Sequence, residues 1–540
     1  MLDLLLRGGT VVDGTGAPAR RADVGIRDGR LVTGGELTGE LAADVLDVSG
    51  LVVCPGFIDM HAHADLALLR EPAAPDALLQ GVTCEVLGQD GLAYAPIDDT
   101  IAAELHARIR SWNGPEPPGG LTWTSVADYL DRVDGAGVNV AYLAPHGTIR
   151  MLAMGTEERR ATAVEMTTMR RLLAEALTDG AVGMSTGLTY VPATYADTTE
   201  LIDLCRVVAA HGGFFAPHHR SYGAAAMAAY AECVEIARAS GAALHLTHAH
   251  LSFPVNRGRA RDLLTLVDQA RADGVDVTLD SYPYLAGASY LHAFLPSWIQ
   301  AGTVDQVIDR LADPRVRARL HDDLEVNGCD GSHGLPVDWS TVLVSGVEHE
   351  ADAGVVGSTI AEIAARQGVP PLDAYCDLLI SNRLGAMCLV FAGDEDNVRA
   401  ILQHPAHMAG SDGLLEGERP HPRAYGTFAR YLAWAVRDEG LVSIEEMVRK
   451  MTSAPAGRLG LADRGRIRPG MAADVVCLDP ATVQDRATYE NPRQPPQGIA
   501  HVIVNGSVAV QDGQLTGALA GRSLRRSPGS VRTPPQERSE

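Results

Sequence analysis

The strongest chemical signal in the sequence is a pair of histidines that follows a short apolar segment. Residues 55–63 read Pro-Gly-Phe-Ile-Asp-Met-His-Ala-His, which places His61 and His63 two positions apart. Because side chains alternate between the two faces of a strand, both imidazoles are expected on one face. Neutral imidazole nitrogens bind divalent metals at about 2.0–2.1 Å. The pair therefore indicates part of a metal site, although an isolated pair is as often two solvated loop histidines.

Three further strand-like segments end in side chains of the same chemistry. His218 follows Phe-Phe-Ala-Pro, His248 ends the run that begins at Leu244, and Asp412 follows Met-Ala-Gly-Ser. Their repetition favours a shared metal centre over unrelated loop residues. A divalent metal lowers the pKa of bound water from about 15.7 toward 7, and a nearby carboxylate can take up and return the proton. The pattern therefore predicts a metal centre that can activate water, with the Asp412 carboxylate beside it.

Eight apolar strand-like runs in the middle of the chain alternate mostly with helical stretches. The runs are 57–61, 82–88, 138–144, 181–186, 213–218, 242–248, 275–281 and 407–412. This alternation predicts an α/β fold, a (β/α)8 TIM barrel over residues 57–462, with the active site at the carboxyl ends of the strands. More than one helix separates the last two runs, so we expect a lid-like insertion around residues 285–400 at the barrel mouth.

Both ends of the chain carry short β-rich segments separated by Asp-Gly or Asn-Gly turns. Such turns between apolar runs are typical of β-hairpins. Since chain termini often lie close together, residues 1–56 and 463–525 are predicted to pair into one small β-sandwich domain. Residues 526–540, rich in Arg, Ser and Pro, are predicted to be a flexible tail.

The charge balance excludes some partners. The 540 residues include 45 basic and 68 acidic side chains, a formal net charge of −23, which disfavours nucleic acid and anionic membrane surfaces as partners. No apolar run approaches the roughly 20 residues of a membrane helix, and the N-terminus does not read as a secretory signal, so a cytoplasmic location is expected. The 8 cysteines form no Cys-x-x-Cys pair, which disfavours a cysteine-based zinc site. The sequence does not predict an oligomeric state.

Further motifs accompany the strand-end histidines. They are Ser-Thr-Gly-Leu-Thr-Tyr at 185–190, Ser-Tyr-Pro-Tyr at 281–284, Ser-Asp-Gly at 411–413, His-Pro-Arg-Ala-Tyr-Gly-Thr-Phe at 421–428, and the segments 465–474 and 504–506. With these motifs the chain resembles the amidohydrolase superfamily, and within it the D-aminoacylase (N-acyl-D-amino-acid deacylase) branch. The resemblance covers about residues 1–525.

The resemblance implies a role for each matching residue. The implied metal is Zn²⁺ at one or two positions, and the implied substrate is a small N-acyl amino acid. His61 and His63 would hold one metal position, His218 and His248 the other, tighter one, and Asp412 would be the acid/base and a further metal ligand. The substrate carboxylate would contact Arg423, Tyr190 and Ser289.

The sequence departs from this branch at two positions. D-aminoacylases carry a cysteine within Gly-Asn-Cys-Gly after strand two, where this chain has Asp90, and Cys84 lies six residues too early to replace it. A carboxylate can replace a thiolate as an anionic ligand, so we predict that Asp90 binds metal, with a hydrogen bond to a ligand histidine as the alternative. Because a carboxylate is the harder donor, Mn²⁺ or Co²⁺ is expected to be tolerated better than at a cysteine site. His250 stands where the branch has a substrate-binding lysine and is itself predicted to bind substrate, as a shorter side chain that is only partly charged at neutral pH. The remaining strand-end histidines, His146 and His219, are predicted to be structural.

Three classes of function follow from these observations. The first is a metal-dependent deacylase of N-acyl-D-amino acids or close analogues, whose D-preference comes from the resemblance alone. The second is a cyclic-amide hydrolase or deaminase on the same fold; run 181–186 lacks the metal-bridging lysine of hydantoinases, which counts against that type. The third is a catalytically silent scaffold, which is disfavoured because every candidate histidine and Asp412 is present.

Overall fold

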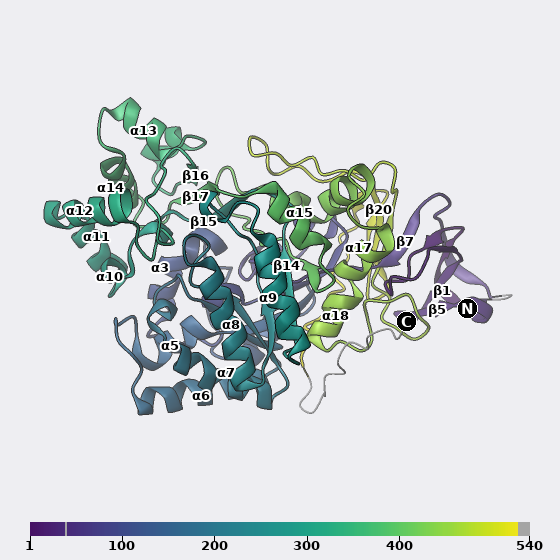
Figure 1. The fold of residues 1–540 in the computed structure, drawn as a ribbon. Coiled ribbons are helices and arrows are strands. Elements are labelled where there is room, and N and C mark those ends of the chain that lie inside the picture. Colours follow the sequence, from purple (N-terminus) through teal and green to yellow (C-terminus); the bar gives the residue numbers. More distant parts are fainter. Residues whose placement is uncertain (38–39, 527–540) are drawn as a thin grey trace.

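The computed structural model describes residues 1–37 and 40–526 (Figure 1). Its centre is an eight-stranded parallel sheet in the order β18-β14-β13-β12-β11-β10-β9-β8. Hydrogen bonding of Met60 N–H to Ala409 O and a bridge between Ala62 and Gly413 join the first and last strands. The predicted TIM barrel is therefore confirmed, and each predicted run overlaps one strand. The strands are β8 (Phe57–Asp59), β9 (Val82–Leu87), β10 (Asn139–Pro145), β11 (Gly183–Gly187), β12 (Phe214–His218), β13 (Ala243–Leu246), β14 (Val277–Ser281) and β18 (His407–Ala409).

Helices surround the barrel and cover its strands (Figure 1). Their apolar faces explain the packing: Leu201, Leu204 and Val208 recur at helical spacing and are all buried in the main core. Capping boxes fix two of the helix starts, at Ser125 and Thr162. The helices of this part are α1 (Ala67–Arg70), α2 (Pro75–Leu78), α3 (Ala102–Asn113), α4 (Val126–Val133), α5 (His146–Met154), α6 (Ala163–Thr178), α7 (Thr198–Ala210), α8 (Ala226–Ser240), α9 (Ala260–Ala272), α15 (Glu395–Gln403), α16 (Arg423–Arg430), η8 (Tyr431–Asp438), α17 (Ile444–Met451) and α18 (Ser453–Leu459), with short turns η2 (Gln89–Gly91), η3 (Ala193–Tyr195) and η4 (Pro254–Asn256).

A separate lobe follows β14 and contributes to the barrel mouth (Figure 1). It contains an antiparallel sheet, in the order β15-β17-β16, and has its own apolar core around Leu311, Tyr375 and Leu379. Within the predicted range 285–400, α15 instead packs against α9 and β18 of the barrel. The elements of the lobe are β15 (Ala286–Tyr290), η5 (Leu291–Phe294), α10 (Ser297–Gln300), α11 (Val304–Ala312), α12 (Pro314–His321), η6 (Asp322–Asn327), β16 (Val342–Gly346), η7 (Glu350–Val355), α13 (Ile360–Gln367), α14 (Pro371–Ser381) and β17 (Met387–Phe391).

The two ends of the chain form a β-sandwich together, as predicted. One sheet has the order β5-β4-β1-β6, and the other has the order β22-β21-β20-β19-β7-β2-β3. In the second sheet, β7 from the N-terminal part of the chain pairs with β19 from the C-terminal part. Leu6 and Ile26 of the first sheet are buried in one core with Val53 and Val475 of the second. The strands and the short turn η1 are β1 (Leu2–Arg7), β2 (Thr10–Val11), β3 (Arg20–Arg21), β4 (Val24–Arg27), β5 (Arg30–Thr33), η1 (Gly34–Leu37), β6 (Ala42–Asp47), β7 (Val52–Pro55), β19 (Val475–Leu478), β20 (Ile499–Val504), β21 (Ser507–Gln511) and β22 (Gln514–Leu515).

Two sequence predictions concern the remaining parts of the chain. The predicted tail, residues 526–540, lies outside the described residues except for Arg526. Among the described residues, no helix combines the length and the apolar character that crossing a membrane requires.

Candidate metal centre

The loop after β8 is held so that its two histidines stay at the barrel mouth. Asp59, at the end of β8, accepts hydrogen bonds from the backbone N–H groups of His61 (3.0 Å) and Ser411 (2.9 Å). The backbone N–H of Asp412 in turn donates to the carbonyl of His61 at 2.7 Å. These bonds join the loops that follow the first and last barrel strands, so both loops present their side chains from one rigid frame.

Three of the predicted site residues have left-handed backbone conformations. The φ angles are 55° at Asp90, after β9, 30° at His248, after β13, and 51° at Asp412, after β18. Such conformations cost about 1–3 kcal/mol in residues other than glycine and concentrate at functional sites. His218, by contrast, is the last residue of β12 and lies in regular strand geometry.

The Asp90 carboxylate lies among the four predicted histidine ligands. Its Oδ1 is 3.2 Å from Nε2 of His248 and 3.6 Å from Nε2 of His61. Its Oδ2 is 3.5 Å from Nδ1 of His218 and 3.7 Å from Nε2 of His63. Asp90 therefore lies within reach of all four histidines and would supply a carboxylate to a metal held by either pair.

Asp412 completes the arrangement on the side of the first histidine pair. Its Oδ1 lies 3.2 Å from Nε2 of His63 and 3.6 Å from Nε2 of His61. The ligand atoms of each of two groups lie within 4.8 Å of one another; the groups, which share Asp90, are His61, His63, Asp90 and Asp412, and Asp90, His218 and His248. The structure thus brings together all six predicted metal residues.

The chemistry of these residues fits divalent metal ions. Both ring nitrogens of His61 are buried without a hydrogen-bond partner among the described residues, and buried polar atoms are rarely left unpaired in folded proteins. Imidazole nitrogens and carboxylate oxygens are the donors that zinc, manganese and cobalt accept. We name the two groups together, with their shared Asp90, the candidate metal centre.

Electrostatics at the candidate metal centre favour a cation. Burial raises the pKa of Asp90, but the imidazoles of His248, His61 and His218 outweigh it and hold the pKa well below its usual value. Burial lowers the pKa of His248, but Asp90 and Asp412 raise it to about 9. The carboxylates therefore draw positive charge toward this point, which a divalent ion would supply.

Three residues that the sequence analysis did not assign orient the imidazoles. Thr189 Oγ1 lies 2.7 Å from Nε2 of His218, and Tyr222 Oη lies 2.9 Å from Nδ1 of His248. Asp280, the penultimate residue of β14, accepts the backbone N–H of His248 at 2.7 Å. The hydroxyls of Thr189 and Tyr222 leave Nδ1 of His218 and Nε2 of His248 facing Asp90, while Asp280 holds the backbone of His248.

Some of these partners had a signal in the sequence. Thr189 lies inside the motif at 185–190, and Asp280 lies near the end of an apolar strand, close to where the metal residues lie on theirs. No sequence signal marked Tyr222. The two histidines predicted to be structural lie outside both ligand groups. His146 contacts Thr186 and Glu200, and the His219 ring lies 4.0 Å from the ring of Tyr230.

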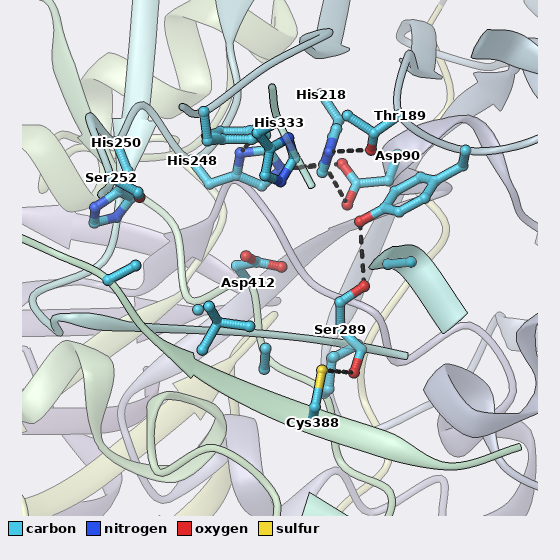
Figure 2. A pocket seen from close by; sticks show the side chains of 18 of the residues that line it. Asp90, Thr189, His218, His248, His250, Ser252, Ser289, His333, Cys388 and Asp412 are labelled. Carbon is cyan, nitrogen blue, oxygen red and sulfur yellow. Dashed lines mark hydrogen bonds and ion pairs between the residues drawn. The ribbon is translucent and has the colours of Figure 1, made fainter. Parts of the chain in front are cut away.

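The predicted substrate-binding residues line one cavity with Asp412. The cavity has about 900 Å³ of empty space, its open mouth included, and its lining contains Tyr190, His250, Ser289 and Arg423. Figure 2 shows the imidazoles on one side of Asp412 and Ser289 on the other. Tyr190 Oη lies 3.4 Å from Ser289 Oγ, which links a barrel loop to the lobe.

Arg423 is fully buried, and its guanidinium is only partly satisfied. Its Nη2 lies 2.9 Å from Oδ2 of Asp412, and the guanidinium lies 4.5 Å from the centre of the Tyr282 ring. Its Nε and Nη1 have no hydrogen-bond partner among the described residues. The His250 ring lies 4.2 Å from the same Tyr282 ring, tilted by 33°. Burial, with His248 and Arg423, lowers the pKa of His250 to about 3. Arg423 is therefore the residue best able to receive a carboxylate.

Comparison with known proteins shows which proteins this chain resembles. A model of the amidohydrolase family matches residues 44–510. The chain is 38% identical to a D-aminoacylase of Alcaligenes xylosoxydans xylosoxydans over 533 residues, 97% of this chain and 98% of that protein. A D-aminoacylase structure described as having a binuclear metal centre is 36% identical, with a TM-score of 0.82, covering 97% of this chain and 100% of that one. The Bordetella bronchiseptica N-acyl-D-glutamate deacylase, complexed with zinc and a phosphonate inhibitor, is 35% identical, with a TM-score of 0.81 and the same coverage.

Proposed function

This chain belongs to the amidohydrolase family, and from that premise we propose that it hydrolyses the amide bond of N-acyl-D-amino acids, releasing a carboxylate and the free amino acid. One observation carries the proposal: the candidate metal centre and the buried, half-satisfied guanidinium of Arg423 open into the same cavity. An acyl amino acid has the two features that such a site recognises, an amide and a carboxylate.

The six residues of the candidate metal centre would hold one or two divalent ions, and the zinc in the N-acyl-D-glutamate deacylase structure supports zinc as the metal. When bound, such an ion lowers the pKa of water and polarises a carbonyl oxygen. Asp90 supplies a carboxylate to both groups. Because carboxylate oxygens are harder ligands than thiolates, we propose that manganese or cobalt is also accepted.

The chain's own residues supply binding and proton transfer. Arg423 would hold the substrate carboxylate through its partnerless Nη1, and the hydroxyls of Tyr190 and Ser289 would donate to the same group. Asp412 Oδ1 lies beside His63 at 3.2 Å, and its Oδ2 beside Arg423 at 2.9 Å. In hydrolysis, Asp412 would accept a proton from the attacking water and return it to the amine nitrogen as the C–N bond breaks.

The test measures amino-acid release from a substrate panel. We expect turnover of N-acetyl-D-methionine, loss of turnover after chelation and recovery when zinc is restored, with N-acetyl-L-methionine turned over at least about ten times more slowly. Turnover of a hydantoin or dihydropyrimidine while acyl-D-amino acids stay inert would replace the proposal with the cyclic-amide alternative. Full activity of metal-free protein would contradict the role of the metal.

Three expectations from the sequence remain predictions. They are the cytoplasmic location, the absence of nucleic-acid partners that the net charge of −23 indicates, and the domain boundaries at 56/57 and 462/463.

A further inference from the structure

The wall that the lobe contributes to the cavity carries no charged side chain in the described part of the chain. The lobe residues that line the cavity include Ser289, Phe294, His333, Cys388, Val390 and Ala392. Cys388 and Val390 alternate along β17, so both face the cavity. Figure 2 shows Ser289 and Cys388 across the cavity from the imidazoles, with Asp412 between them. A substrate bound at Asp412 and Arg423 therefore meets this wall with the rest of its structure.

The cavity holds one strong cation. Among the described residues that line it, Arg423 is the only lysine or arginine, and Asp412 already contacts its Nη2 at 2.9 Å. Nε and Nη1 have no partner, and because they point from opposite edges of the guanidinium, Nη1 alone can donate to an oxygen of an incoming carboxylate group. If the α-carboxylate of an acyl amino acid takes Nη1, no other guanidinium or ammonium lines the described part of the cavity to pair with a second carboxylate.

The histidine of the wall does not replace the missing cation. Burial lowers the pKa of His333 to about 3, so this imidazole is neutral. Its ring lies 5.7 Å from the ring of Phe253 and 5.5 Å from the ring of Tyr222, both of which line the cavity. Nδ1 of His333 is buried without a partner among the described residues. This part of the cavity is thus aromatic and uncharged.

A side-chain carboxylate would be poorly tolerated in these surroundings. It would lose its hydration without gaining a side chain of opposite charge on this wall. An uncharged side chain would instead bury apolar surface against Phe294 and Val390.

We propose that the lobe wall, with Phe294 and Val390 at its apolar part, is the side-chain pocket of the enzyme and selects N-acyl-D-amino acids with uncharged side chains over those of glutamate and aspartate. The inference rests on the proposed function and narrows it. Overall similarity does not decide this point, because the D-aminoacylase and N-acyl-D-glutamate deacylase structures match the chain almost equally, at 36% and 35% identity.

The first experiment compares two substrates of nearly equal shape. We expect kcat/KM for N-acetyl-D-glutamine to exceed that for N-acetyl-D-glutamate by at least about 100-fold in the zinc-loaded protein. Burying a carboxylate without a partner costs several times the free energy that corresponds to a tenfold change in kcat/KM. N-acetyl-D-methionine should be at least as good as the glutamine derivative.

The second experiment adds the missing charge to the wall. Val390 is only half-buried, so a long side chain can be accommodated there. Val390→Lys should raise kcat/KM for N-acetyl-D-glutamate relative to N-acetyl-D-glutamine by about tenfold or more, whereas the uncharged control Val390→Met should not change this ratio.

The outcomes separate the two proposals. Equal turnover of the glutamate and glutamine derivatives by the unaltered protein would overturn this inference and leave the proposed function standing. An unchanged ratio in Val390→Lys, with turnover of N-acetyl-D-methionine retained, would overturn the assignment of Val390 to the pocket. Absence of turnover with every acyl-D-amino acid would overturn the proposed function, and this inference with it.

Discussion

Nη2 of Arg423 lies 2.9 Å from Oδ2 of Asp412, and both side chains are buried. The residue that we assign to carboxylate recognition therefore contacts the residue that we assign to proton transfer. Substrate binding and the acid/base are coupled through this one ion pair.

Replacing Arg423 should change both binding and pH dependence. Burial raises the pKa of Asp412, but Arg423 and His61 hold it below its usual value, so the carboxylate form persists to low pH. In Arg423→Met the pKa rises, so activity should be lost at a higher pH as the pH falls, and kcat/KM should drop by about 100-fold or more. Arg423→Lys keeps the charge, so the pH at which activity is lost on acidification, the acidic limb of the pH profile, should stay near its original value. A pH profile of kcat/KM measures both effects, and an unmoved limb in Arg423→Met would contradict the coupling.

Removing the acid/base should leave a protein that binds metal but does not turn over. In Asp412→Asn we expect kcat to fall by about 10²–10⁴-fold, the usual contribution of general acid/base catalysis. Metal should remain bound by Asp90, His218 and His248, which form a group without Asp412. Steady-state kinetics with metal analysis on the same samples tests this, and a kcat near that of the unaltered protein would exclude Asp412 from proton transfer.

The shared carboxylate should determine which metals bind. Asp90→Asn removes the charge that faces four imidazoles, so both metal positions should lose affinity. Asp90→Cys supplies a softer anion and should favour zinc over manganese relative to the unaltered protein. Competition titrations measure the preference, and the absorption spectrum of the Co²⁺ form should gain a thiolate-to-metal band only in Asp90→Cys. Unchanged metal affinity in Asp90→Asn would show that Asp90 is not a ligand.

The Tyr222 hydroxyl should support metal binding without touching the ion. Tyr222→Phe removes the 2.9 Å contact with Nδ1 of His248, and the loss of such a partner typically costs about 10–100-fold in metal affinity. Zinc titration against a chelator measures this effect. Tyr195→Phe makes the same change at a hydroxyl that donates to Ser297 O, and it should leave zinc affinity unaltered; equal affinities in both variants would contradict the role of Tyr222.

Glu85, a buried acid on β9, should lower the stability of the fold at high pH. Burial is the main reason why the pKa of Glu85 lies well above its ordinary value of 4.5, and the negative charges of Asp76 and Asp59 raise it further. Oε2 of Glu85 has no hydrogen-bond partner among the described residues. Because the folded pKa is raised, the contribution of Glu85 to stability is complete below the unfolded pKa and is lost as the pH rises toward the folded one. Glu85→Gln cannot ionise, so its melting temperature should exceed that of the unaltered protein by about 2 °C or more at pH 8, and by less at pH 5. A difference that stays constant with pH would contradict the assignment.

The positions of the metal residues could be predicted because the barrel fold brings the carboxyl ends of all its strands to one mouth. A residue at the carboxyl end of a barrel strand must lie at the mouth, so His218, His248 and Asp412 converge although the sequence separates them widely. Asp90 was harder to assign, since its role depends on a left-handed turn after β9. Tyr222 could not be found, because its contact with His248 depends on the path of a loop. The uncharged lobe wall likewise depends on tertiary packing that no local pattern encodes.

The most direct test of the candidate metal centre is anomalous X-ray diffraction at the zinc absorption edge from crystals of the zinc-loaded protein. We predict a peak at bonding distance, about 2.0–2.2 Å, from Asp90 and the ring nitrogens of His218 and His248, with any second peak at His61 and His63. A crystal grown in excess zinc with no anomalous peak beside Asp90 would contradict the account.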